Sequence, residues 1–367
     1  MGNWKNGELG DFVTLKRGFD LPQQKREDGQ VPIFSSSGIT GTHSTAMVKA
    51  PGVITGRYGT IGEVFYAAKD FWPLNTTLFV EDFHGNDAKF IYYFLKTLEW
   101  SKFTSASAVP GINRNTVHKE IVSLPDIETQ RRIASTLSMF DEKIEINTEI
   151  NDNLYAQAKA IFDNHFINID AIPAGWRKGN LLDIANYLNG LAMQKFRPQG
   201  NEIGLPVLKI KELRQGSCDD SSELCSLRIK PEYIIHDGDV IFSWSGSLLV
   251  DIWCGGTCGL NQHLFKVTSD IYDKWFYYLW TAHHLARFIA IAADKATTMG
   301  HIKREELAKA EVLIPCEEDY TSLTSIMQPI FELIISNRIE GRKLAVLRDE
   351  LLPKLMSGEI DVSAVQL

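Results

Sequence analysis

The chain has 367 residues, which is enough for two or three domains, and 44% of them are hydrophobic, as in an ordinary globular protein. It has no apolar run long enough to cross a bilayer, no signal peptide and too few cysteines for a disulfide framework, so we expect a cytoplasmic protein. The formal net charge of −8 at first argues against a nucleic acid as partner.

The negative charge is confined to two segments of the chain. Residues 126–170 carry 4 basic and 9 acidic side chains, and residues 316–367 carry 5 and 9. Residues 1–125 carry 13 basic and 12 acidic side chains, and residues 171–315 carry 16 of each. Two nearly neutral regions can each present a local basic face, whereas the acidic segments should face solvent or protein partners.

The two nearly neutral regions are two copies of one pattern. Matching segments follow in the same order in both copies: residues 4–18 (WKNGELGDFVTLKRG) and 176–190 (WRKGNLLDIANYLNG), 53–61 (VITGRYGTI) and 240–248 (VIFSWSGSL), 74–79 (LNTTLF) and 260–265 (LNQHLF), and 122–125 (VSLP) and 312–315 (VLIP). Short β-branched runs between glycines and prolines predict strands in each copy, with one or two short helices. The sequence therefore predicts a tandem duplication of an α+β domain.

Each copy is followed by a segment with the pattern of a long helix. From residue 133, mainly apolar residues recur at alternating steps of four and three, and the same series recurs 190 positions later. This pattern is typical of a coiled-coil seam, over a helix of about 39 residues and roughly 58 Å. Both series carry asparagine at the fifth place, Asn147 and Asn337, where a polar residue costs stability but fixes the alignment of two helices. The alternative is two ordinary amphipathic helices packed on separate cores.

Catalytic and metal-binding motifs are mostly missing. The chain has no G-x-x-x-x-G-K-[ST] phosphate loop, no glycine-rich dinucleotide fingerprint and no Asn-Pro-Pro-aromatic segment of the kind amino-methyltransferases use. Residues 141–143 (DEK) match the acidic-x-Lys element of many nucleases but lack an upstream Pro-Asp partner. The spacing of Cys254, Cys258 and His263 does not fit the common zinc sites. We therefore expect no catalytic residue, metal or cofactor in this chain.

The order of these features resembles the specificity subunit of type I restriction–modification enzymes. The motifs that carry the resemblance are residues 172–176 (IPAGW) opening the second copy, 55–62 (TGRYGTIG) in the first, and 347–360 (LRDELLPKLMSGEI) ending the second helix. The resemblance covers essentially the whole chain. The second copy departs from the glycine-rich pattern, because Trp244 stands where Arg57 is and Leu249 where Gly62 is.

The resemblance implies a pseudo-twofold symmetric α+β protein with two target-recognition domains and two long helices that form an antiparallel coiled coil. The expected boundaries are residues 1–125 for the first domain, 126–168 for the first spacer helix, 169–315 for the second domain, 316–358 for the second spacer helix and 359–367 for a C-terminal tail. Each domain would read one half of an interrupted target in double-stranded DNA.

The same resemblance implies the partners of the chain. The helices would dock two methyltransferase (modification) subunits, and restriction or motor subunits would join the larger complex. S-adenosylmethionine, ATP and Mg²⁺ are expected on those partners and not on this chain. The alternative from another class is a coiled-coil scaffold or adaptor that binds only proteins, for which the acidic composition would be natural.

Candidate DNA-binding residues lie in turns, strands and basic clusters of both copies. Arg57 and Tyr58 lie between glycines in an expected tight turn, where arginine can reach a guanine edge or a phosphate; the alternative is a glycine hairpin with a solvated arginine. The other candidates offer hydroxyl, amide, imidazole, indole or basic groups: Lys16, Arg17, Lys25, Arg26, Thr60, Asn75, Thr76 and Arg114 in the first copy, and Lys209, Lys211, Arg214, Ser243, Trp244, Ser245, Ser247, Asn261, Gln262, His263, Lys303 and Arg304 in the second. Each of them can also be a solvated, capping or core side chain.

Overall fold

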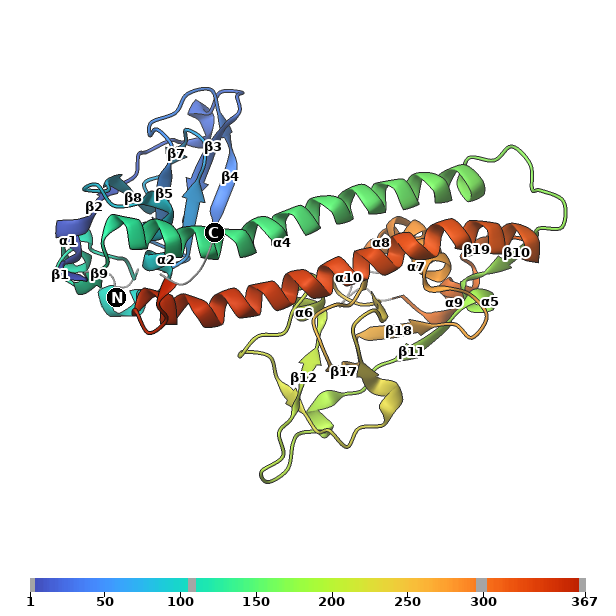
Figure 1. The fold of residues 1–367 in the computed structure, drawn as a ribbon. Helices are drawn as coiled ribbons and strands as arrows, with labels where there is room; N and C mark the ends of the chain where they lie inside the picture. Colours follow the sequence, from blue (N-terminus) through green and yellow to red (C-terminus); the bar gives the residue numbers. More distant parts are fainter. Residues whose placement is uncertain (1–3, 105–109, 295–301, 363–367) are drawn as a thin grey trace. The chain divides into compact units, whose positions relative to one another are not determined.

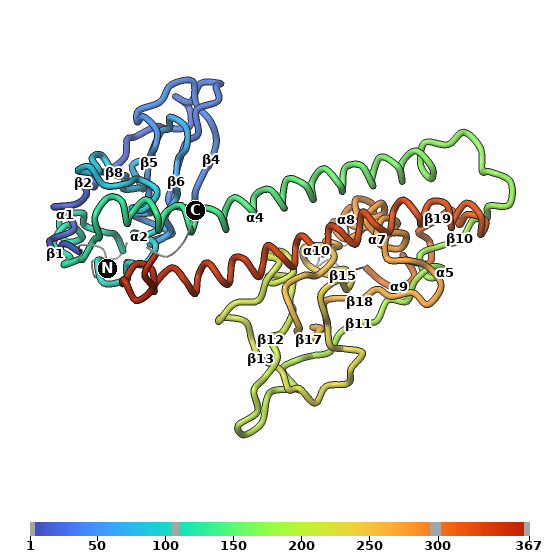
Figure 2. The backbone as a smooth tube through the Cα atoms, viewed as in Figure 1, coloured from blue at the N-terminus to red at the C-terminus, as the bar shows by residue number. Residues whose placement is uncertain are grey.

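The computed structural model describes residues 4–104, 110–294 and 302–362. The chain divides into two compact units, Met1–Glu142 with Ala345–Leu367, and Lys143–Leu344. Each unit holds one copy of the duplicated pattern and a part of each of two long helices, α4 (Ile127–Phe162) and α10 (Glu317–Met356) (Figure 1). Figure 2 follows the backbone from the first copy into α4, through the second copy and into α10. The predicted α+β class, with two β-rich domains and two long packed helices, is confirmed.

The first copy forms three small sheets. Its elements are β1 (Lys5–Glu8), α1 (Leu9–Phe12), β2 (Thr14–Arg17), η1 (Gln23–Lys25), β3 (Val31–Ser35), β4 (Gly38–His43), β5 (Gly52–Gly56), β6 (Val64–Ala67), β7 (Trp72–Pro73), β8 (Thr77–Asp82), α2 (Ala88–Lys96), η2 (Trp100–Phe103), α3 (Arg114–Val117) and β9 (Ile121–Leu124). The sheets have the strand orders β2-β8-β5-β6, β4-β3-β7 and β1-β9. The central strands β5 and β8 carry short apolar runs that are buried on both faces, as such runs predict.

The second copy has more elements but the same plan. Its elements are β10 (Arg177–Asn180), α5 (Leu181–Ile184), β11 (Asn186–Asn189), η4 (Met193–Lys195), β12 (Leu205–Leu208), α6 (Ile210–Gln215), β13 (Leu224–Cys225), η5 (Pro231–Tyr233), β14 (Ile234–Ile235), β15 (Val240–Ser243), β16 (Leu249–Ile252), β17 (Cys258–Leu260), β18 (Leu264–Thr268), α7 (Lys274–His283), α8 (Leu285–Asp294), α9 (Arg304–Ala308) and β19 (Glu311–Ile314). The order β11-β18-β15-β16 repeats β2-β8-β5-β6, the parallel pair β12 and β17 repeats β3 and β7, and β10-β19 repeats β1-β9. The duplication read from the sequence is therefore a duplication of topology.

The alignment of the two copies shifts by one residue ahead of strands β8 and β18. The sequences pair Leu74 with Leu260, whereas the structure pairs Leu74 with Asn261. The N–H of Leu74 donates to the carbonyl of Phe34 at 2.8 Å, and the N–H of Asn261 donates to the equivalent carbonyl of Leu208 at 3.2 Å. The backbone bonds place these two residues in the same position, so the letter-by-letter match over residues 74–79 and 260–265 is corrected by one.

Each long helix begins two residues after a proline that ends the preceding copy. Asp126 caps α4, because its carboxylate accepts a hydrogen bond from the N–H of Thr129 at 3.0 Å. The first turn of α10 carries acidic residues, which suit the positive end of the helix dipole. Every predicted seam position on the two helices is buried or half-buried. Beyond its last α-helical turn, α4 continues into a π-helical turn, η3 (Asp163–Ile167).

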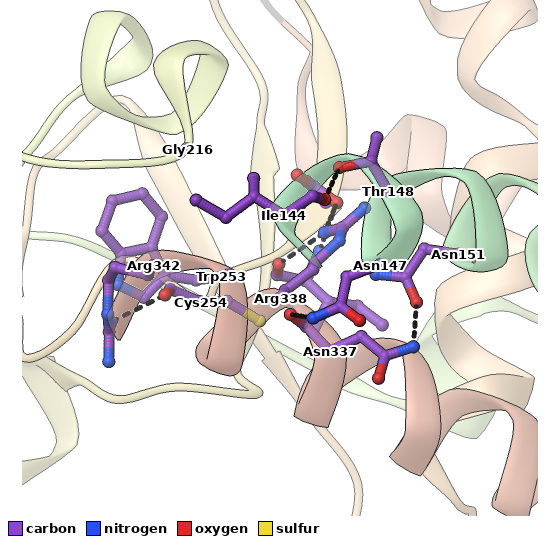
Figure 3. A pocket seen from close by; sticks show the side chains of 13 residues that line it. Ile144, Asn147, Thr148, Asn151, Gly216, Trp253, Cys254, Asn337, Arg338 and Arg342 are labelled. Carbon is purple, nitrogen blue, oxygen red and sulfur yellow. Dashed lines mark hydrogen bonds and ion pairs between the residues drawn. The ribbon is translucent and has the colours of Figure 1, made fainter. Parts of the chain in front are cut away.

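The asparagines of the seam link the two helices within the second unit (Figure 3). The amide of Asn147 donates to Glu340 Oε2 at 2.6 Å and more weakly to the carbonyl of Asn337 at 3.4 Å. Asn337 donates to Asn151 Oδ1 at 3.0 Å, and Asn151 to the carbonyl of Ile334 at 3.3 Å. Residue numbers rise along one helix as they fall along the other, so the helices are antiparallel, as predicted. Both proposed register residues lie at the seam, but the side chain of Asn337 pairs with Asn151 and not with Asn147.

Leucine at the two seam asparagines should change stability in opposite directions. Asn147 is 2% exposed and its Oδ1 has no hydrogen-bond partner among the described residues, whereas Glu340, which would lose a donor, is exposed and can be hydrated instead. Asn147→Leu should therefore raise the free energy of unfolding by about 1 kcal/mol. Asn337→Leu removes the donor to the buried Asn151 Oδ1 and should lower it by a similar amount, about 1 kcal/mol. Urea denaturation of both variants measures the two changes. Equal shifts of the same sign would contradict the pairing described here.

Two arginines of α10 bind the second copy beside this seam, around a hollow of about 280 Å³ (Figure 3). Arg338 donates to Asp251 at 2.8 Å, and Arg342 donates to the two carboxylate oxygens of Asp237 at 2.8 and 2.7 Å. The arginines that line the hollow are thus engaged with the domain itself. We interpret this region as the joint that fixes α10 on the second copy.

The cysteines considered above as a zinc site are part of the hydrophobic core. Cys254 and Cys258 belong to two different core clusters. No group of three or more His, Cys, Asp or Glu side chains within residues 4–104, 110–294 and 302–362 is placed to hold a metal ion. None of the helices in the same ranges is long and apolar enough to cross a membrane.

Candidate nucleic-acid interface

The first copy has a hollow at the end of its four-stranded sheet. It measures about 470 Å³ and is bordered by the last residue of β2, the segment after β5, the start of β8 and the start of α3. Three arginines, Arg17, Arg57 and Arg114, line it together with Tyr58, and no acidic residue of the described ranges belongs to the lining. The other lining residues are Leu78, Gly111, Ile112, Asn113 and Asn115. Four candidates from the sequence are therefore brought together in one place.

Arg57 is held in position by its neighbours in this hollow. Its N–H donates to the carbonyl of Thr76 at 2.8 Å, and its carbonyl accepts from the N–H of Ile112 at 3.0 Å. The guanidinium carbon lies 4.6 Å from the centre of the Tyr58 ring, and Nε donates to the carbonyl of Ile112 at 3.4 Å. A stacked and hydrogen-bonded arginine has less side-chain freedom to lose when it binds a partner. The geometry therefore favours a preorganised contact over a freely solvated side chain.

Glycines make this arrangement possible. A Cβ on Gly111 would lie 2.1 Å from the Tyr58 ring, and a Cβ on Gly56 would lie 1.8 Å from the carbonyl of Thr60. Gly59 has a φ of +79°, in the left-handed region that favours glycine. The tight turn expected from the sequence is present, and the missing side chain of Gly111, outside the turn, lets the Tyr58 ring approach the backbone closely.

The second copy has a larger hollow of about 600 Å³. Lys303 and Arg304 are its cations, and Trp244 is the third of its residues that the sequence analysis selected. The indole N–H of Trp244 donates to Asn189 Oδ1 at 2.9 Å. The remaining lining residues are mostly aromatic, aliphatic or amide side chains: Asn186, Tyr187, Leu188, Tyr233, Phe265 and Ile302. As in the first copy, no acidic residue of the described part of the chain belongs to the lining.

The two hollows are equivalent positions of the duplicated fold. In the first, the N–H of Ile112 donates to the carbonyl of Arg57 at 3.0 Å; in the second, the N–H of Ile302 donates to the carbonyl of Trp244 at 2.9 Å. The last residues of β2 and β11 line the two hollows, and so do the first residues of α3 and α9. One site has thus been duplicated with the domain, and its side chains have since diverged.

The other candidates of the first copy do not line its hollow. Two of them already have acidic partners, since Lys16 pairs with Glu81 and the amide of Asn75 donates to Asp20. The remaining ones lie elsewhere on the first copy: Lys25, Arg26, Thr60 and Thr76. The sequence showed that these side chains are basic or polar, but it did not show the acidic residues with which Lys16 and Asn75 interact.

Basic candidates in the β12–α6 region of the second copy are also paired. Lys209 pairs with Glu223, and Lys211 with Asp219 at 3.3 Å. Such exposed pairs contribute little to stability, but they reduce the charge available to a DNA phosphate. Four further candidates outside the second hollow are exposed or half-buried: Arg214, Ser247, Gln262 and His263.

Several polar candidates of the second copy hold its own turns together. Ser243 is completely buried, and its hydroxyl donates to the carbonyl of Ser245 at 3.2 Å. The buried Ser245 hydroxyl is hydrogen-bonded to His263 Nδ1 at 3.0 Å, and the buried Asn261 accepts from the N–H of Gln262 at 2.8 Å. Because a fully buried hydroxyl is not accessible to DNA, the expectation for Ser243 is corrected. The capping role held as the alternative for such residues applies here.

The asparagines that line the two hollows were not among the residues predicted from the sequence. Asn189 is the clearest case, because it aligns with Arg17 in the first repeated segment and faces the same hollow position. Asn113 and Asn115 flank Arg114 in the first copy. The alignment of the copies was the signal that could have found Asn189, whereas Asn113, Asn115 and Asn186 needed the fold.

Comparison with known proteins identifies the family. The family model of the type I restriction modification DNA specificity domain matches residues 1–156 and 173–345. The chain belongs to this family. It is therefore a DNA specificity subunit, a non-catalytic member of a type I restriction–modification system. The resemblance read from the sequence is confirmed.

Two relatives agree with this assignment, and one solved structure shares the fold. The specificity subunit is 27% identical over 307 residues to that of the type I restriction enzyme MjaIX of Methanocaldococcus jannaschii, covering 76% of this chain and 70% of that one. It is 20% identical over 344 residues to the HindI specificity subunit of Haemophilus influenzae, covering 72% and 75%. Its fold resembles the crystal structure of the S subunit of a type I system from M. genitalium, with a TM-score of 0.60, 17% identity and 96% of each chain covered.

Proposed function

We propose that each domain of this specificity subunit reads one half of a bipartite target in double-stranded DNA, and that the hollows described above are the reading surfaces. The observation that carries the proposal is the duplicated site itself. Each copy presents cations and donors at the same place in its fold, with no acidic residue of the described ranges in the lining. Cationic and amide side chains are the groups that contact phosphates and base edges. We keep residues 1–125 and 169–315 as the boundaries of the two recognition domains.

We also propose that the exposed faces of the long helices dock two methyltransferase subunits. The support is a set of exposed apolar side chains at helical spacings: Met139, Ile146 and Ile150 on α4, and Ile326, Leu333 and Leu347 on α10. Exposed apolar side chains that share a helix face are typical of protein-binding surfaces. In this proposal S-adenosylmethionine is bound by the methyltransferase subunits, and ATP with Mg²⁺ by restriction or motor subunits, in the cytoplasm.

Exchange of one domain tests the proposal. Replacing residues 171–315 with the corresponding domain of a relative, in the full chain co-expressed with its methyltransferase subunit, should change one half of the methylated motif and leave the other half as it was. The physical reason is that each copy carries a complete hollow of its own. Single-molecule mapping of methylated bases in cellular DNA gives the motif.

The reciprocal exchange of residues 1–125 is the matched control and should change the other half only. A change in both halves after either exchange would contradict independent reading. If the wild-type complex forms but binds target and random duplexes equally well, the chain acts as a protein scaffold and the proposal fails.

A further inference from the structure

The two hollows differ in a way that separates two kinds of DNA contact. This step rests on the proposed function, in which both hollows meet DNA. The sugar–phosphate backbone is the same in both halves of the target, whereas the bases differ. Side chains that contact the backbone should therefore be the same in the two copies, and side chains that read bases should be different. The chain carries both versions of one site, so it supplies its own comparison.

Two of the paired lining positions keep the same residue. Ile112 and Ile302 are each 2% exposed, and their N–H groups close the turn, so the fold itself explains why they are retained. Arg114 and Arg304 are the other retained pair, at the first residue of α3 and of α9. Both arginines are exposed, and neither makes an ion pair with any residue in the described ranges. Packing does not require an exposed arginine at this place, so its retention points to a shared ligand.

Leu78 with Phe265 and Asn113 with Lys303 are paired lining positions that differ. Two further differing positions are next to each other. In the second hollow, Asn189 and Trp244 are joined by the hydrogen bond from the indole N–H. Their counterparts in the first hollow are Arg17, which forms a long exposed ion pair with Asp20 at 3.7 Å, and Arg57. A pair of cations thus corresponds to an amide with an indole. Two arginines can donate to the O6 and N7 acceptors of guanine, whereas asparagine is suited to adenine and an indole offers an apolar face. The two pairs therefore have different base preferences.

We infer that Arg114 and Arg304 contact DNA phosphates in the two half-sites, and that the pairs Arg17–Arg57 and Asn189–Trp244 determine which bases the two half-sites contain. Arg114 and Arg304 then position the DNA on each domain and contribute to the affinity for any DNA sequence. Asn189 becomes a specificity-determining residue of the second domain.

The test uses the full chain in complex with its methyltransferase subunit. Arg114→Ala and Arg304→Ala should each weaken binding to target and random duplexes by the same factor. Each should also reduce the salt dependence of binding by about one counterion. The methylated motif should be unchanged in both. Arg114→Lys and Arg304→Lys keep the charge and should recover most of the lost affinity, which a general effect on folding would not allow.

Arg17→Ala and Asn189→Ala should behave differently. Each should relax the methylated motif at a base of one half-site only, the half assigned to its own domain by the domain exchange. Lys69→Ala and Arg228→Ala are matched controls, because both residues are exposed cations outside the two hollows. They should change neither the motif nor the binding.

Two results would overturn the inference while the proposed function stands. One is a wild-type complex that binds its target specifically, with Arg114→Ala or Arg304→Ala changing the motif. The other is Asn189→Ala weakening target and random binding equally. A wild-type complex with no site-specific binding would instead overturn the proposed function, and this inference with it.

Discussion

Replacing Arg348 with alanine should lower the free energy of unfolding by about 2–3 kcal/mol. Arg348 on α10 donates to Asp141 Oδ1 on α4 at 2.5 Å, inside the first unit. The hydroxyl of Tyr93 donates to the other carboxylate oxygen at 2.5 Å. The two charged side chains are only 17% and 26% exposed, so removing one leaves the other charge largely buried without its partner.

The tyrosine keeps its proton in this arrangement. Burial, and after it the hydrogen bond to Asp141, raises the pKa of Tyr93 well above its ordinary value. The phenol therefore remains a donor at neutral pH. Asp141 thus has a second, permanent partner in this layer, which compensates for part of the charge that the Arg348→Ala variant leaves behind. This is one reason to expect a loss below that of a fully buried ion pair.

The second unit supplies the control for this prediction. Tyr278, Phe331 and Ala158 occupy the positions that correspond to the tyrosine, the aspartate and the arginine of the first unit. The rings of Tyr278 and Phe331 are 5.6 Å apart, and all three residues belong to one apolar cluster. The same layer of the duplicated fold is therefore built once around an ion pair and once from apolar side chains.

The double variant Asp141→Phe/Arg348→Ala copies the apolar layer into the first unit. It should lose less stability than Arg348→Ala alone, because no charge is left buried without its partner. Urea denaturation with equal m-values for all variants gives the comparison. Equal losses in the single and the double variant would mean that packing, and not the unpaired charge, sets the cost.

The long helices could be predicted closely because their signal is local. A seam of apolar residues at steps of four and three depends only on helix geometry, and every predicted seam position is buried or half-buried. Which residues face each other across the seam depends on the stagger between the two helices, and the sequence of either helix does not specify that stagger. For this reason Asn147 and Asn337 were placed at the seam, but the bond between Asn337 and Asn151 was not foreseen.

The hollows could be predicted only in part, because they join segments that are far apart in the sequence. The turn at Arg57 was visible as glycines around an arginine, but its contact with Ile112 spans 55 residues. Ion pairs such as Lys16 with Glu81 also join residues that are far apart in the sequence. A basic residue in such a pair is a weaker candidate for DNA binding, although the sequence alone does not distinguish it from an unpaired one. The order of matching segments predicted for the two copies agrees with the structure. The one-residue shift in their alignment at Leu74 could be seen only from the backbone hydrogen bonds.

Arg57→Ala should weaken binding to the target by about 1–3 kcal/mol and relax the methylated motif at one base position of the first half-site. Binding to random duplex should change much less, because a base contact carries sequence information and a phosphate contact does not. The structure favours base reading, since Tyr58 and the carbonyl of Ile112 hold the guanidinium in a fixed direction. A phosphate contact does not need such preorganisation.

Arg57→Lys separates the two roles of this residue. Lysine keeps the positive charge but cannot form the planar two-point contact that arginine makes with guanine. If Arg57 reads a base, Arg57→Lys should lose most of the selectivity that Arg57→Ala loses. If it holds a phosphate, lysine should restore binding, and Arg57→Ala should weaken target and random duplexes equally, with the salt slope smaller by about one. Titrating both variants, in complex with the methyltransferase subunit, against both duplexes at several salt concentrations decides between these outcomes. Unchanged affinity and motif in Arg57→Ala would make Arg57 a residue of the turn alone.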